Sequence, residues 1–321
     1  MIWAKLSHEK FLTLHFRQAI IAISGPGSRH LRKQKPRGRT TVATTKPPEI
    51  RIMKKAISVI IIFLAAQVAT PIVAVYILKA IGDSGLFGQV NLETVADSPI
   101  GLSILLIIAY GITVLALYGF RLLSPGAGLA RRALHIIPAV LTLLFAEVPI
   151  TFMQEILKLP DITVNTNVGP LMHNALGIIT IVIVGPVVEE LVFRRAVLGS
   201  LMEGGMRPLR AVIISGLLFG LIHFNPAQML PAAILGCLLG WVYVRTGNLL
   251  SSIILHAINN GLSVLIANTA YADTTLSELT GSTALSAVAA CLCAGIAILL
   301  LRIYNKHTEE EPIITEEVNE D

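Results

Sequence analysis

Three groups of polar side chains lie within successive apolar segments and contain the residue types that hydrolysis needs. They occur in TIVIVGPVVEELVFRR, then FGLIHF, then HAINN, and they comprise Glu189, Glu190, Arg194, His223, His256 and Asn260. A carboxylate with an imidazole can activate water as a general base, and imidazole or amide N–H groups can stabilise an oxyanion. A charge at the centre of a membrane helix costs roughly 2.5 to 3.5 kcal/mol, so its presence there is a functional hypothesis by default.

The first group predicts two different roles for two adjacent acids. Glu190 and Arg194 are four residues apart and share one helix face, so we expect them to neutralise each other. Glu189 is rotated about 100° from its neighbour on a helix of 3.6 residues per turn. We therefore expect Glu189 to point elsewhere and to remain free to act.

The second group is placed by a predicted helical hairpin. Its turn is GGMRP at residues 204–208, and Met206 lies 17 residues from both Glu189 and His223. At a rise of about 1.5 Å per residue, equal contour lengths on two antiparallel arms put the acid and the histidine at the same depth.

The third group adds a third helix. His256 and Asn260 are one turn apart on one face, and their helix starts from a turn at Thr246-Gly247-Asn248. Asn260 should lie roughly 18 to 20 Å above that turn, which approaches the level of Glu189 and His223. The sequence therefore predicts that three helices converge on one polar cavity.

Composition requires a membrane for these helices. The chain has 321 residues, of which 54% are hydrophobic and 14% charged, and its mean hydropathy is +0.73. A soluble domain carries about 25% charged residues, and about 20 apolar residues cross a bilayer core. We predict an all-α, polytopic transmembrane helix bundle of about eight membrane helices, at residues 56–80, 100–121, 133–153, 175–203, 209–225, 229–245, 249–269 and 283–303.

The two ends differ from the predicted membrane domain at 56–305. Residues 1–55 hold thirteen Lys or Arg against two acids and predict a disordered basic leader, within which Met53 is the favoured natural start. Residues 306–321 form an acidic tail. The net charge of +5 arises from these segregated ends, so we do not expect nucleic acid as a partner.

Basic residues also predict orientation. Arg and Lys follow the second, fourth, sixth and eighth predicted spans, whereas the intervening loops are mainly acidic. Because basic loops remain in the cytoplasm, we expect a multi-pass protein of the cell membrane with both termini inside. Cys237, Cys291 and Cys293 lack the spacing of a disulfide framework or a thiolate metal site.

The order EExxxR, FxxxH, HxxxN on successive apolar segments resembles the CAAX protease and bacteriocin-processing family of intramembrane proteases. The resemblance covers a motif core at residues 175–265. It implies cleavage of a membrane-associated protein or peptide substrate, with Glu189 and His223 activating water and His256 with Asn260 holding the oxyanion. Glu190 and Arg194 would organise the site, and Phe219 would pack near it and contact substrate.

A catalytic zinc is the alternative to this metal-free mechanism. Glu189, His223 and His256 would be its three ligands, which is the number that a catalytic zinc takes from protein. The HExxH zinc signature is absent from the sequence. We expect no cofactor, with zinc as the competing reading.

Other functions use the same residue types. Glu190 with Arg194 could be a structural ion pair, and each histidine could be a hydrogen-bonding group between helices. A transporter or proton-coupled carrier also places acids and histidines at mid-membrane, but no correspondence between the two halves of the chain supports one. A catalytically silent membrane scaffold is the third reading.

Overall fold

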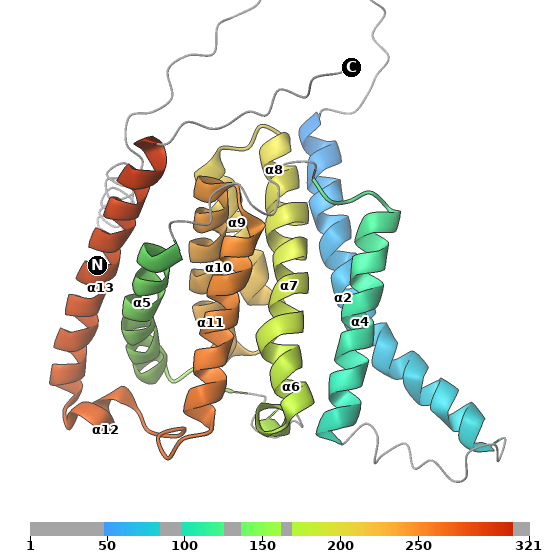
Figure 1. Cartoon of the computed structure of the whole chain (residues 1–321), viewed down its shortest axis with the longest axis horizontal. Helices are drawn as coiled ribbons and strands as arrows, with labels where there is room; N and C mark the ends of the chain where they lie inside the picture. The colour runs from blue at the N-terminus through green and yellow to red at the C-terminus, as the bar shows by residue number, and fades with distance from the viewer. Residues whose placement is uncertain (1–47, 84–97, 125–135, 162–168, 311–321) are drawn as a thin grey trace, which may run out of the picture. The chain divides into compact units, whose positions relative to one another are not determined.

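The computed structural model describes residues 48–83, 98–124, 136–161 and 169–310, and these ranges contain no β-strand. The helices are α2 (Pro48–Asp83), α4 (Pro99–Gly119), α5 (Ile136–Leu157), η2 (Gly169–His173), α6 (Ala175–Ile179), η3 (Thr180–Val184), α7 (Gly185–Glu190), η4 (Leu191–Leu198), α8 (Gly199–Glu203), α9 (Pro208–Leu221), α10 (Pro226–Thr246), α11 (Leu249–Ala267), α12 (Leu276–Thr280) and α13 (Thr283–Glu310) (Figure 1).

Seven of these helical stretches are long and apolar enough to cross a membrane. They are Met53–Ala74, Pro99–Gly119, Ile136–Leu157, Ala175–Glu203, Pro226–Thr246, Leu249–Ala267 and Thr283–Lys306. The remaining predicted span, at 209–225, corresponds to α9, which is apolar but has only 14 residues. The predicted all-α, polytopic helix bundle is confirmed.

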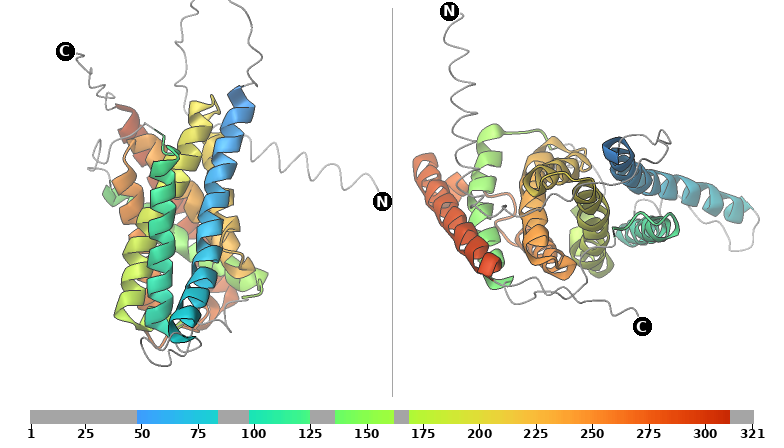
Figure 2. Two further views of the ribbon diagram at one scale, coloured as in Figure 1. Left: turned by 90° about the vertical axis from the view of Figure 1, so that its right-hand side faces the viewer. Right: turned by 90° about the horizontal axis from the view of Figure 1, so that it is seen from above.

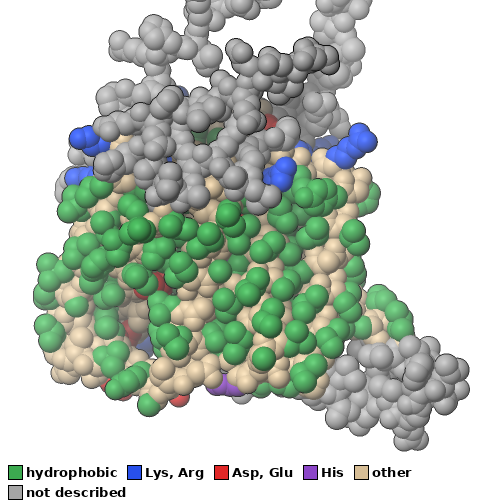
Figure 3. Space-filling view, viewed as in Figure 1, with side chains coloured by type: hydrophobic (Ala, Val, Ile, Leu, Met, Phe, Trp, Pro, Cys, Tyr) green, Lys and Arg blue, Asp and Glu red, His purple; other side chains and the backbone are tan. Residues whose placement is uncertain are grey.

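The surface has the character of a bilayer-facing one. Large apolar side chains such as Leu115, Leu265 and Leu292 are 74%, 64% and 64% exposed. Apolar side chains cover most of the face in Figure 3, while most of its visible Lys and Arg gather near one end. Isolated exposed apolar residues are ordinary in soluble proteins, but a continuous apolar surface is not.

The predicted ends fall largely outside the described residues. Residues 1–47 and 311–321 are outside them, and so is most of both the basic leader and the acidic tail. Helix α2 begins at Pro48, so residues 48–55 of the predicted leader are helical. Helix α13 continues to Glu310, so residues 306–310 of the predicted tail are helical as well.

Proline and asparagine set the starts of the helices around the site. Asn174, Asn225 and Asn248 are the N-caps of α6, α10 and α11, and each side-chain oxygen accepts a hydrogen bond from a backbone N–H of the first turn. Pro208 and Pro226 occupy the first helical positions of α9 and α10, where no N–H partner is needed. The Asn-Pro pair after His223 is therefore a helix start, and it fixes where the histidine lies.

The segment Ala175–Glu203 is one continuous helix that changes its winding twice. The π-helical stretches η3 and η4 interrupt the α-helical geometry on either side of α7, which contains both acids. Such wide turns are rare and occur mostly at functional sites. This helix lies at the centre of the bundle, with α9, α10 and α11 beside it, α2 with α4 on one side and α5 with α13 beyond α10 and α11 (Figures 1 and 2).

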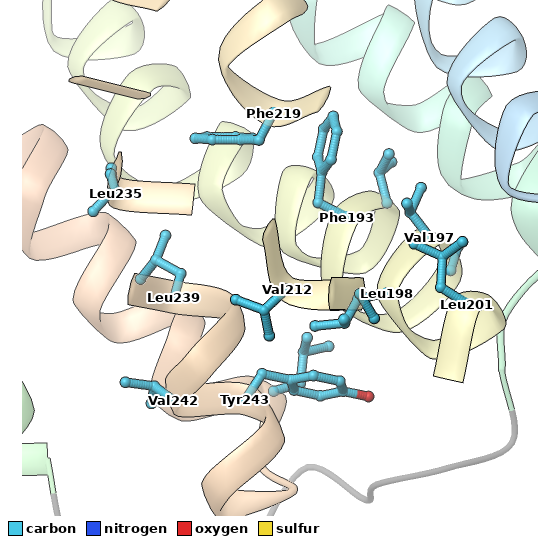
Figure 4. Close-up of a cluster of buried hydrophobic side chains, with 14 of the residues drawn as sticks. Phe193, Val197, Leu198, Leu201, Val212, Phe219, Leu235, Leu239, Val242 and Tyr243 are labelled. Atoms are coloured by element: carbon cyan, nitrogen blue, oxygen red, sulfur yellow. The ribbon is translucent and has the colours of Figure 1, made fainter. Parts of the chain in front are cut away.

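Glycines bring α9 and α10 into close contact. A Cβ on Gly216 would lie 2.5 Å from the sulfur of Cys237, and one on Gly236 would lie 2.9 Å from the Cα of Gly216. Large apolar side chains fill the remaining space between these helices and the central helix, and Figure 4 shows them from Phe193 and Phe219 at one end to Tyr243 at the other.

Gly220→Ala is expected to destabilise the protein by about 1 to 3 kcal/mol, the usual cost of overpacking. Its Cβ would overlap the carbonyl oxygen of Met229 and approach the backbone nitrogen of Ala233 to 3.0 Å. Thermal unfolding in detergent measures the effect. Gly111→Ala on α4 is the matched control, because a Cβ there meets nothing within 4 Å. Equal stability of the two variants would contradict the close helix contact.

Candidate active site

The centre of the site is a buried chain of charges from Arg194 to His256. The Nε of Arg194 lies 2.9 Å from Oε2 of Glu190, and Oε1 of Glu190 lies 2.9 Å from Nδ1 of His256. The side chains of Arg194 and Glu190 are 0% exposed. The predicted pairing of Glu190 with Arg194 is therefore present. It is a close charge contact rather than an aligned hydrogen bond, because the N–H of Arg194 is not directed at the carboxylate oxygen.

Two further contacts hold the Arg194 guanidinium. Nη2 donates a hydrogen bond to the carbonyl oxygen of Gly236 at 3.3 Å, and the guanidinium carbon lies 5.0 Å from the centre of the Phe219 ring. Nη1 is buried and has no hydrogen-bond partner among the described residues. A buried arginine held by a carboxylate, a carbonyl and an aromatic face is fixed in position, as is the carboxylate beside it.

Glu189 differs from its neighbour in exposure and in partners. Its side chain is 15% exposed, and Oε2 lies 3.7 Å from Nε2 of His256. Oε1 accepts a hydrogen bond from the hydroxyl of Tyr110 on α4 at 2.9 Å. His256 therefore lies between the two acids, with Nδ1 towards Glu190 and Nε2 towards Glu189. Glu189 is the acid that water can reach.

His223 approaches this cluster through an aromatic ring. It lies just beyond the end of α9, and its Nδ1 is 2.9 Å from the carbonyl oxygen of Phe219. A carbonyl can only accept, so Nδ1 carries the proton and Nε2 is left as an acceptor. The ring of Phe219 stands edge-on to both His223 and His256, with ring centres 5.2 and 5.4 Å apart.

Asn260 contacts the central helix rather than the acids. Its amide nitrogen donates to the carbonyl oxygen of Ile181, within η3, at 2.9 Å, and its oxygen accepts from the amide of Asn259 at 3.3 Å. Of the predicted site residues, the structure brings Glu189, Glu190, Arg194, Phe219 and His256 into mutual contact. His223 joins them through Phe219, and Asn260 joins through the backbone.

The predicted zinc ligands do not form a ligand group. Within the part of the chain that the structure describes, no three or more His, Cys, Asp or Glu side chains are placed to hold a metal ion. Glu189 and His256 are close, whereas His223 contacts the ring of Phe219, which also contacts His256. The metal-free mechanism stays a prediction, and zinc remains its alternative.

A separate pocket of about 640 Å³ lies at the turn between α8 and α9. Met53, Met206, Arg207 and Arg210 are among its lining residues, and none of the motif residues is. The site is therefore assigned by the contacts among the acids and histidines, not by the volume of this pocket.

Tyr110 is the site residue that sequence reasoning missed. It stands in an apolar span outside the motif core, and nothing in the motifs points to it. A tyrosine within an apolar membrane span was the available signal, because a buried tyrosine hydroxyl usually finds a hydrogen-bond partner.

Comparison with known proteins places a family match over the motifs. Residues 171–262 match the family model described as type II CAAX prenyl endopeptidase Rce1-like. The matched range contains all of the predicted site residues and omits Tyr110.

Three curated bacterial proteins are similar over part of the chain. YdiL of Bacillus subtilis, named as a candidate membrane peptidase, is 32% identical over 91 residues, which are 28% of this chain and 37% of that protein. The UPF0177 protein YxdF of Lactococcus lactis is 36% identical over 76 residues, which are 23% of this chain and 41% of that protein. The membrane-embedded CAAX protease MroQ of Staphylococcus aureus is 35% identical over 89 residues, which are 26% of this chain and 36% of that protein. The chain thus matches about two fifths of each relative. No solved structure matches significantly.

Proposed function

We propose that this chain hydrolyses a peptide bond of a membrane-associated protein or peptide, because residues 171–262 match the Rce1-like CAAX endopeptidase model and 89 residues are 35% identical to a membrane-embedded CAAX protease. The observation that carries the proposal is the position of His256 between two carboxylates of different character. Glu190 is buried and paired with Arg194, whereas Glu189 is partly exposed and, among the described residues, has no Lys or Arg partner and faces His256. One acid is suited to orienting the imidazole and the other to proton transfer.

In the proposed reaction, Glu189 removes a proton from a water molecule as that water attacks the scissile carbonyl carbon. His223, through its free Nε2, helps to orient the water. The carbon–nitrogen bond then breaks as the protonated Glu189 gives its proton to the leaving amine, which restores the carboxylate. Every proton taken is thus returned, and the products are a carboxylic acid and an amine.

His256 and Asn260 are proposed to stabilise the oxyanion of the tetrahedral intermediate. Nδ1–H of His256 is directed at Glu190, so donation to an oxyanion requires a proton on Nε2 as well. The amide of Asn260 bonds to Ile181, and donation requires its second N–H or a release from that carbonyl. Oxyanion donors of this kind contribute about 10²- to 10³-fold in kcat.

The location and the partners that we propose are those expected from the sequence. We propose that the protein lies in the cell membrane with both termini in the cytoplasm and that the lipid bilayer and a membrane-associated substrate are its partners. We further propose that hydrolysis proceeds without a metal. If a chelator abolished cleavage and added zinc restored it, the zinc mechanism would replace the metal-free one.

His223→Gln is expected to lower kcat by about 10²-fold or more, the range of a lost general acid–base partner. The assay follows cleavage of membrane-tethered peptides by purified protein in lipid, with and without chelator. His173→Gln is the matched control, because the ring of His173 contacts Asn268 rather than the acids or Phe219. If His223→Gln cleaved a peptide at the same rate as the wild type, the proposed role of His223 would be overturned.

A further inference from the structure

Tyr110 makes the hydrogen bond that fixes the acid proposed as the base. Its hydroxyl donates to Oε1 of Glu189 at 2.9 Å, across 79 residues of sequence and from a different helix. Helix α4 packs against α7 and both π-helical stretches, which places Tyr110 beside the acids. The opposite carboxylate oxygen, Oε2, is the one that faces His256.

The backbone near Tyr110 leaves space for this bond. A Cβ on Gly185 would lie 3.2 Å from the Tyr110 hydroxyl and 3.6 Å from Oε1 of Glu189. Glycine at this position therefore permits the phenol and the carboxylate to meet beside the helix. The Tyr110 ring is held separately, stacked on Phe63 with ring centres 6.4 Å apart.

We infer that Tyr110 is a positioning residue for Glu189, an inference that rests on the proposed peptidase function. By occupying Oε1, the phenol fixes the rotation of the carboxylate and leaves Oε2 as the oxygen that receives the proton from water. A carboxylate free to rotate would present either oxygen, and fewer encounters would have the geometry for proton transfer. Tyr110 lies outside the family match at 171–262, so the match does not assign it.

Tyr110→Phe is expected to lower kcat about tenfold or more with KM unchanged, the effect of losing one hydrogen bond to a charged group. Phenylalanine keeps the ring that stacks on Phe63, so packing and unfolding temperature should be retained. Tyr118→Phe is the matched control, because Tyr118 is on the same helix and is 59% exposed. If Tyr110 had only a structural role, Tyr110→Phe would change the unfolding temperature, and kcat would not fall while KM stayed unchanged.

Gly185→Ala supplies a second, independent test. In an otherwise wild-type protein, the methyl group added at position 185 would crowd the Tyr110 hydroxyl and Glu189, and we expect kcat to fall. In the Tyr110→Phe background that hydroxyl is absent, so adding Gly185→Ala should lower kcat by a smaller factor than it does alone.

The outcomes separate this inference from the function on which it rests. Cleavage by wild type and by Tyr110→Phe at the same kcat would overturn the role of Tyr110 alone. A wild-type protein that cleaves no peptide of the panel would instead overturn the proposed function, and the positioning role would fall with it.

Discussion

Glu189→Gln is expected to reduce cleavage by at least about 10³-fold, the upper part of the range for general acid–base catalysis. Glutamine has nearly the same volume as glutamate, and its carbonyl oxygen can still accept the hydrogen bond from Tyr110. It cannot take a proton from water, so the substitution removes the chemistry and keeps the packing. We therefore expect an unfolding temperature close to that of the wild type.

Glu147→Gln is the matched control for this substitution. Glu147 lies in the middle of α5, within another membrane-spanning helix, and forms no hydrogen bond or ion pair with other described residues. Both variants remove one acid from the membrane-embedded part of the protein, and single-turnover cleavage in lipid compares them. Loss of cleavage in both would mean that intramembrane charge, rather than the position of Glu189, is what matters. Full activity of Glu189→Gln would exclude it as the base.

Local rules were sufficient for the parts of the site that lie on one continuous helix. The spacing of Glu190 and Arg194 predicts their pairing, because residues four apart are neighbours on any helix face. The partial exposure of Glu189 beside a fully buried Glu190 also agrees with two acids having two roles. Apolar runs of sufficient length gave seven membrane helices and the short α9.

The rest depends on departures from regular geometry. A uniform rotation of 100° per residue directs Glu189 and Glu190 apart, yet both reach His256, and a π-helical stretch begins directly after them. Equal contour lengths predict that Glu189 and His223 lie at one depth, but they do not predict that Phe219 contacts both histidines. Nor does any sequence rule predict that a tyrosine 79 residues away completes the site.

Arg194→Leu is expected to destabilise the folded protein by about 3 to 5 kcal/mol, the usual effect of removing one partner from a buried ion pair. Glu190 would lose the cation beside it in a position where its side chain is 0% exposed, with His256 as its remaining partner. Thermal unfolding in detergent measures the loss. Arg195→Leu is the matched control at the adjacent position. Among the described residues the Arg195 side chain donates only to the carbonyl oxygen of Ser124, at 3.3 Å, and about 1 kcal/mol or less is expected there.

Adding Glu190→Gln to Arg194→Leu separates the structural part of this ion pair from its catalytic part. The double substitution removes both charges, so much of the lost stability should return, because a neutral pair leaves no buried charge uncompensated. Cleavage should not return, because the glutamine oxygen can still accept Nδ1–H of His256 but carries no charge to stabilise the ring protonated on both nitrogens that the proposed oxyanion contact requires. If Arg194→Leu alone were as stable as the wild type, the contact with Arg194 would not stabilise the fold, and the assignment of two roles to the two acids would be wrong.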